Sequence, residues 1–342
     1  MSIWPGARAA AIFVMAIGCL SGAGCALWND IVPPPLHGVT RIEKAGLAME
    51  FSPFIDRVTY FGPASDGGKN ALHVVDLERA VPEDGSYTFF GGCYSWVAPQ
   101  KSVPAGEDVI AGWIDGARVP RDWPPDPAMD IGPVRRTGAG PDWLTSIGPE
   151  HRTGLVEGKT LRIVDRNRAM ITYTVANRGN DTVAAGCWLT TAAAPDSVIA
   201  VRMPEGAQVY GWDDRSVRLF ESALSARDGR GWRTLRPGDA KWEGGIKVYI
   251  AAPAGTPMDI AVWSPECRSW LHRSQPALSE EAMSRLIAMG EGPVAVYMEP
   301  SAGIFEAELY GPIETLAPGG ATTVAETWAM VDARIADTSL LP

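Results

Sequence analysis

The chain has few of the features that reveal an enzyme or a nucleic-acid-binding protein from sequence. Its 342 residues include only four His, and 30 Lys and Arg against 40 Asp and Glu give a net charge of −10. No run of Lys or Arg offsets this charge, which repels nucleic acid at long range, so we predict no nucleic-acid partner. Nucleophile-elbow, phosphate-loop and dinucleotide motifs are also missing. No His pair has metal-ligand spacing, so we predict neither a metal nor a cofactor.

Long apolar runs are scarce as well. The longest, from Ala9 to Leu20, has about a dozen apolar residues, whereas a transmembrane helix needs about 20. It follows Arg8 and precedes the small residues of 21–24, a pattern typical of an export signal.

Cys25 directly follows these small residues, and the segment resembles the lipobox of bacterial lipoproteins. The resemblance implies that Cys25 carries lipid and becomes the new N-terminus, and Ala26 after it suggests an outer-membrane lipoprotein facing the periplasm. Cys19 is an alternative lipidated residue. An ordinary secretory signal and an uncleaved anchor are alternative interpretations of the whole segment.

Four regions follow from this pattern: a signal peptide over 1–24, a Pro-rich linker over 25–38, one domain over 39–334 and a tail over 335–342. The run Pro33–Pro35 favours a semi-rigid spacer. If Cys25 carries lipid, Cys93, Cys187 and Cys267 allow at most one disulfide, and all three can equally be small buried hydrophobes.

The domain alternates apolar and polar residues with a period of two, which predicts an all-β fold. Residues 39–42 and 47–51 form a hairpin-like pair, and Ala169–Ala176 is the most regular strand, with its return strand expected over 183–191. One helix is predicted, capped by Ser279 and ended by Gly290. Further strands are predicted over 55–61, 71–77, 197–203, 246–251, 258–263, 294–298, 304–310 and 322–331.

Several segments together resemble galactose-mutarotase-like (aldose-epimerase-like) proteins, and an uncharacterised bacterial family on that fold in particular. The resemblance covers about residues 39–331. The segments that carry it are Pro53–Val58, Asn70–Leu72, Gly91–Gln100, Trp123–Asp130, the expected hairpin Thr172–Thr191, and Leu309–Gly320. It implies a β-supersandwich of two large antiparallel sheets with one short helix and a concave surface that faces carbohydrate.

Two departures weaken an epimerase interpretation. Mutarotases use a His and a carboxylate as general acid and base, which must both reach the sugar ring oxygen or the anomeric hydroxyl. The segment from Cys187 to Thr191 has no His where the family's central hairpin has one, and Cys93 stands where the related family often has His. His151 and His272 are expected at the surface.

Candidate ligand-binding residues are those able to stack on sugar rings or fix hydroxyls. They are Arg57, Asn70, Trp96, Gln100, Trp123, Asp126, Asp130 and Trp188. Glu306 and Glu308 lie two apart on one predicted strand and should share a face, with Glu299 a second carboxylate candidate. Asp126 and Asp130 can instead cap turns.

Three functions remain open. The first is an envelope-anchored carbohydrate-binding protein, non-catalytic or degenerate, with a carbohydrate ligand and a membrane partner through its lipid. The second is an active sugar-modifying enzyme, epimerase-like or lyase-like, with Glu308 as base and His73 as its partner, although a structural role for His73 is the plainer interpretation. The third is a structural envelope protein without a small ligand.

Overall fold

The computed structural model describes residues 38–65, 69–75, 87–100, 109–111, 125, 127–131, 134–333, 338 and 341. The predicted signal peptide, Cys25 and almost the whole linker lie outside the described residues, as do Trp123 and Asp126. None of the described helices is long and apolar enough to cross a membrane.

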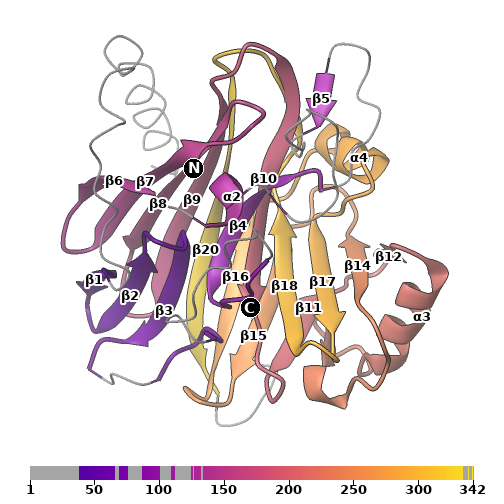
Figure 1. The fold of residues 1–342 in the computed structure, drawn as a ribbon. Coiled ribbons are helices and arrows are strands. Elements are labelled where there is room, and N and C mark those ends of the chain that lie inside the picture. Colours follow the sequence, from indigo (N-terminus) through magenta and orange to yellow (C-terminus); the bar gives the residue numbers. More distant parts are fainter. Residues whose placement is uncertain are drawn as a thin grey trace, which may run out of the picture. The chain divides into compact units, whose positions relative to one another are not determined.

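The described chain folds into two large sheets that pack face to face (Figure 1). The first, 11-stranded sheet has the order β1 (Thr40–Lys44), β2 (Leu47–Ser52), β3 (Arg57–Pro63), β4 (Cys93–Ala98), β10 (Thr182–Ala192), β18 (Ile304–Tyr310), β17 (Val294–Glu299), β14 (Ile246–Ala251) and β12 (Gln208–Gly211), with β5 (Val109–Ala111) and β19 (Glu314–Leu316) also beside β10. Only β5 pairs in parallel, and all other described pairings are antiparallel.

The second, 9-stranded sheet is antiparallel throughout. Its order is β13 (Trp232–Leu235), β11 (Val198–Arg202), β15 (Met258–Ser264), β16 (Ser269–Gln275), β20 (Ala321–Asp332), β9 (Arg168–Asn177), β8 (Leu155–Ile163), β7 (Trp143–Glu150) and β6 (Arg135–Ala139). The predicted all-β class and the two antiparallel sheets are confirmed.

The core lies between the sheets, where alternate side chains of each strand point inward. β20 shows this most clearly, because every second residue from Thr322 to Met330 is buried, including Val324 and Trp328, while the residues that alternate with them are more exposed. The Trp328 ring meets Phe61 of β3 edge to face, with centroids 5.3 Å apart. Such contacts join the two sheets through apolar burial, as in other face-to-face sandwiches.

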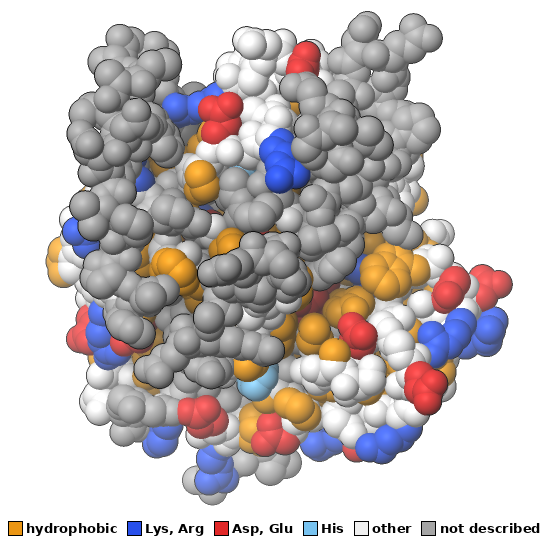
Figure 2. All heavy atoms as spheres, in the orientation of Figure 1, with side chains coloured by type: hydrophobic (Ala, Val, Ile, Leu, Met, Phe, Trp, Pro, Cys, Tyr) orange, Lys and Arg blue, Asp and Glu red, His pale blue; other side chains and the backbone are white. Residues whose placement is uncertain are grey.

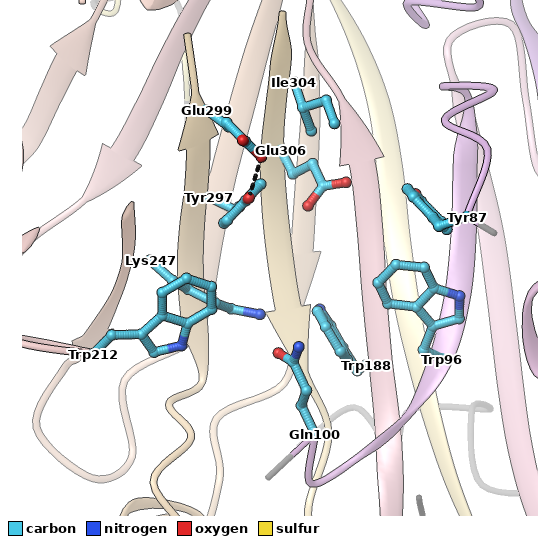
Figure 3. A pocket seen from close by; sticks show the side chains of 10 residues that line it. All are labelled: Tyr87, Trp96, Gln100, Trp188, Trp212, Lys247, Tyr297, Glu299, Ile304 and Glu306. Atoms are coloured by element: carbon cyan, nitrogen blue, oxygen red, sulfur yellow. Dashed lines mark hydrogen bonds between the residues drawn. The ribbon is translucent and has the colours of Figure 1, made fainter. Parts of the chain in front are cut away.

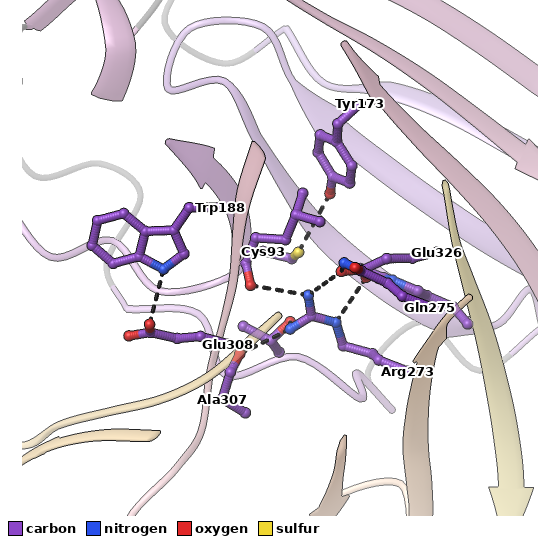
Figure 4. Close-up of polar contacts among 11 residues, drawn as sticks. Cys93, Tyr173, Trp188, Arg273, Gln275, Ala307, Glu308 and Glu326 are labelled. Carbon is purple, nitrogen blue, oxygen red and sulfur yellow. Dashed lines mark hydrogen bonds and ion pairs between the residues drawn. The ribbon is translucent and has the colours of Figure 1, made fainter. Parts of the chain in front are cut away.

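A buried ionic cluster also crosses the interface between the sheets (Figure 4). Arg273 of β16 forms an ion pair with Glu326 of β20, at 2.7 Å. Its guanidinium also donates to the carbonyls of Leu189 on β10 and Ala307 on β18, at 3.1 and 2.8 Å. One fully buried side chain therefore ties two strands of each sheet together.

The expected hairpin of β9 with β10 is wrong. β9 pairs with β8 and β20, whereas β10 pairs with β4 and β18, so consecutive strands belong to opposite sheets. The Asn177 amide stabilises the turn between them by donating to the carbonyls of Asp181 and Leu316, both at 2.8 Å. Period-two alternation cannot distinguish a hairpin from such a crossing, since both need one apolar face per strand.

The predicted helix is present as α4 (Glu280–Ala288), with the Ser279 hydroxyl accepting from the Ala282 N–H at 3.1 Å and Gly290 at a φ of 76°. A second helix, α3 (Asp214–Ala223), was not predicted, although Asp213 caps it by accepting from the Ser216 N–H at 2.6 Å. Two short helical segments, α2 (Pro127–Asp130) and a 3-10 turn (Pro237–Asp239), complete the described helices.

Of the other local expectations, one is confirmed and several are wrong. The hairpin of β1 with β2 is confirmed, with Lys44 opposite Leu47, but the expected strand over 71–77 is only an isolated bridge from Val74 to Gly91 in its described part. His151 and His272 are buried rather than exposed. The strands that were not predicted are β4, β5, β6, β7, β8, β12, β13, β16 and β19. Within the described residues Cys93, Cys187 and Cys267 are free thiols.

Candidate functional site

One face of the 11-stranded sheet, turned away from the second sheet, collects aromatic and charged side chains from five strands. Cross-strand pairing shows why, since paired residues share a face. Trp96 pairs with Trp188, Glu306 of β18 pairs with Tyr297 of β17, and Tyr297 pairs with Lys247 of β14. Glu308 lies two residues beyond Glu306, so the predicted common face of these two carboxylates is confirmed.

A pocket of about 680 Å³ opens on this face. Its size falls within the range of about 300–1,000 Å³ that small-molecule sites occupy. Figure 2 shows hydrophobic side chains around a hollow in the described surface, and Figure 3 shows aromatic rings on opposite sides of the pocket with polar groups between them. The described side chains that line it are Tyr87, Trp96, Gln100, Trp188, Trp212, Lys247, Tyr297, Glu299, Ile304 and Glu306.

Lys247 and Glu308 form a buried ion pair at the inner wall, with 2.9 Å between Nζ and Oε2. The same carboxylate oxygen accepts from the Trp188 indole N–H at 2.9 Å and from the Tyr310 hydroxyl at 3.0 Å. The Lys247 ammonium also lies 3.7 Å from the Trp188 ring centroid, a cation–π distance. These contacts hold the Trp188 ring in one orientation.

Glu306 is the carboxyl group that reaches the pocket itself. It accepts a hydrogen bond from the Tyr94 hydroxyl. Burial, reinforced by the negative charge of Glu308, raises the pKa of Glu306 to about 8. The Glu306 carboxyl is therefore mostly protonated at neutral pH and can donate as well as accept hydrogen bonds.

Substituting Glu306→Gln should flatten the dependence of stability on pH. The folded-state pKa lies above the ordinary value of 4.5, so this group's contribution is fully present below about pH 4.5 and is lost as the pH rises towards 8. The urea midpoint of the wild type should fall over this window, and that of Glu306→Gln should fall less. Exposed Glu205→Gln is the control and should follow the wild type. If the urea midpoint of Glu306→Gln falls with pH as steeply as that of the wild type, the raised pKa of Glu306 is wrong.

A second ionic group supports the pocket from behind Trp96. Buried Arg57 forms an ion pair with Asp130 at 2.7 Å, and its guanidinium lies 3.9 Å from the Tyr94 ring centroid. The Trp96 indole N–H donates to the same Asp130 oxygen at 3.0 Å. Burial raises the pKa of Asp130, which the charge of Arg57 opposes. These contacts of Arg57 and Asp130 hold the Tyr94 and Trp96 rings in place.

The structure brings together only part of the predicted site. Trp96, Gln100 and Trp188 line the pocket, while Arg57, Asp130 and Glu308 lie behind its wall.

Two predicted residues lie elsewhere. The Asn70 amide donates to the Thr59 carbonyl at 2.7 Å, and its oxygen accepts from two backbone N–H groups. His73 is absent from the described pocket lining, and burial lowers its pKa.

Five lining residues were not predicted as site residues: Tyr87, Trp212, Lys247, Tyr297 and Ile304. A signal for Lys247 was present, because it is the single charged residue in the otherwise apolar run 246–251, and a cation inside a buried strand needs a partner. That partner, Glu308, is distant in sequence and could not be identified without the strand order.

No protein-family model matches the sequence, and no curated protein matches it. Several solved structures, however, are similar to this chain. A galactose mutarotase-like protein from Lactobacillus casei has a TM-score of 0.52 and 11% identity, covering 86% of this chain and 100% of its own. The Slr1438 protein from Synechocystis has a TM-score of 0.51 and 11% identity, covering 89% and 99%. The chain therefore has the galactose-mutarotase-like fold, as the sequence resemblance implied.

The chemistry open to this site follows from its groups. Aromatic faces can stack on apolar ring surfaces, and the carboxyl, amide and ammonium groups between them can fix hydroxyls. Within the described part of the chain, no three His, Cys, Asp or Glu side chains are placed to hold a metal ion.

Proposed function

We propose that the pocket binds a carbohydrate and that the protein is a non-catalytic or degenerate relative of the sugar epimerases. The observation that carries this proposal is the combination of a sugar-sized pocket, Trp walls and recessed polar groups on one sheet face. A galactose-mutarotase-like fold alone would not suffice, because one fold hosts many functions.

The contacts of Glu308 support a binding role over a catalytic one. Its Oε2 is shared by Lys247, Trp188 and Tyr310, and the residue is fully buried. A general base must reach the proton that it abstracts, at about 2.6–3.2 Å. No His is among the described side chains that line the pocket.

Titration of the purified full-length protein with neutral monosaccharides (glucose, galactose, mannose, xylose and N-acetylglucosamine) tests this function. At least one should bind. Glu299→Gln should weaken binding about tenfold or more, because hydrogen bonds to charged groups contribute about 1.5–3 kcal/mol. Glu205→Gln, exposed and absent from the pocket lining, is the matched control. Absence of binding by all five sugars and by their oligomers would overturn the proposal.

The alternative is an active aldose-epimerase-like enzyme. The protonated Glu306 favours it, because a carboxyl with a pKa of about 8 can act as a general acid at neutral pH. Glu308 would be the base, and Glu306 rather than His73 would be the acid. Polarimetry separates the two functions: acceleration of anomer exchange by the wild type, abolished in Glu306→Gln, would establish the enzyme.

The N-terminal region carries a separate proposal on location. We propose that Cys25 is acylated and anchors the domain in the cell envelope, at the outer membrane facing the periplasm. Mass spectrometry of the membrane-extracted protein should find an acylated Cys25 as the first residue. An unmodified N-terminus at Ala26 or later in the soluble fraction would contradict it.

A further inference from the structure

The aromatic side chains of the pocket form two separate groups. The inner group is Trp96 and Trp188, whose ring centroids are 4.8 Å apart and which are each 2% exposed. The outer group is Trp212 and Tyr297, with centroids 5.8 Å apart. Trp212 is 40% exposed, unusual for a Trp that lines a pocket.

The two groups lie at different strands of the sheet. Trp188 is on β10 and Tyr297 is on β17, with β18 between them. Neighbouring strands lie about 4.8 Å apart, so these side chains start about 10 Å apart across the sheet. Figure 3 shows Trp212 and Trp96 at opposite sides of the pocket, with the Lys247 ammonium and Trp188 between them.

The polar groups between the aromatic groups indicate a neutral ligand. Glu306 and Glu299 both line the pocket, and at the pocket wall Lys247 already pairs with Glu308. The Glu299 carboxylate has no further cation among the described lining side chains, and it disfavours a uronate or a sugar phosphate through like-charge repulsion. Glu306, protonated at neutral pH, adds no such repulsion, but both carboxyl groups can form hydrogen bonds with the hydroxyl groups of a neutral sugar.

We propose that the pocket has two sugar subsites and binds a neutral oligosaccharide, with one residue at Trp96 and Trp188 and the next on the exposed face of Trp212. This inference rests on the proposed carbohydrate-binding function. Trp212 is then the residue that distinguishes an oligosaccharide from a monosaccharide, because its ring contributes to binding affinity only when the ligand has a second sugar unit.

Calorimetric titration of the full-length protein compares each of the five monosaccharides with its β-1,4- or α-1,4-linked dimer and tetramer, and with trigalacturonate. For the sugar that binds, the oligomer should bind about tenfold or more tightly than the monomer. Trp212→Ala should reduce oligomer affinity about tenfold and monomer affinity less than twofold, because an aromatic plane stabilises only the ring that stacks on it. Trp212→Phe should retain part of the oligomer affinity.

Trp143→Ala is the matched control, because Trp143 is another exposed Trp, 37% accessible, that does not line the pocket. A urea midpoint close to that of the wild type shows that each variant is folded. If monomers and oligomers bind equally and Trp212→Ala changes neither, the two-subsite inference is wrong while the proposed function stands. Tighter binding of trigalacturonate than of neutral oligomers overturns the neutral ligand class. Failure of every saccharide to bind overturns both proposals.

Discussion

Replacing Arg273 with Met is expected to cost about 3–5 kcal/mol of unfolding free energy, the range found when one member of a buried ion pair is removed. The Glu326 carboxylate would remain between the sheets without its cation, and the carbonyls of Leu189 and Ala307 would each lose a donor. Urea denaturation followed by circular dichroism measures the change.

Two further variants make this result specific. Arg273→Met combined with Glu326→Leu should recover much of the loss, because a buried pair replaced by apolar residues of similar volume is often tolerated. Arg168→Met removes an exposed Arg paired with Asp165 at 2.5 Å and should change stability little. An Arg273→Met variant as stable as the wild type would show that the cluster does not hold the sheets together.

The second large effect is expected at the pocket wall. Lys247→Met should lower the unfolding free energy by about 3 kcal/mol or more, because Glu308 would be left buried without its cation. It should also weaken saccharide binding, since the Trp188 ring loses the ammonium that lies 3.7 Å from its centroid. Chemical denaturation and the same calorimetric titration measure the two effects.

Lys247→Met combined with Glu308→Gln tests whether the charge imbalance causes the loss. The double variant should regain most of the stability, since the neutral amide needs no cation, but should regain less of the binding. Exposed Lys241→Met is the control for loss of a Lys as such. If the single and double variants are equally unstable, lost packing rather than the unpaired carboxylate is responsible.

These contacts explain how the sandwich can hold a polar site on one sheet. Arg273 of the second sheet donates hydrogen bonds to the backbone of two strands of this sheet. Lys247 and Arg57 fix the aromatic side chains that form the pocket wall. The site is therefore preorganised, which reduces the entropy lost when a ligand binds.

The sequence determined the local features of this protein. Alternation predicted just over half of the described strands, because side-chain direction along a strand depends only on neighbouring residues. Capping chemistry predicted α4, since Ser279 and Gly290 act within a single turn of the helix. The common face of Glu306 and Glu308 followed from their spacing alone.

Only the tertiary structure decided the sheet to which each strand belongs, and hence the site. β9 and β10 are consecutive and well patterned, yet they lie in opposite sheets. The pocket depends on the order β4, β10, β18, β17, β14, which brings Trp96, Trp188, Glu306, Tyr297 and Lys247 onto one face. Strand order and register arise from pairing between distant segments, and a periodic pattern in one segment carries no information about its partner.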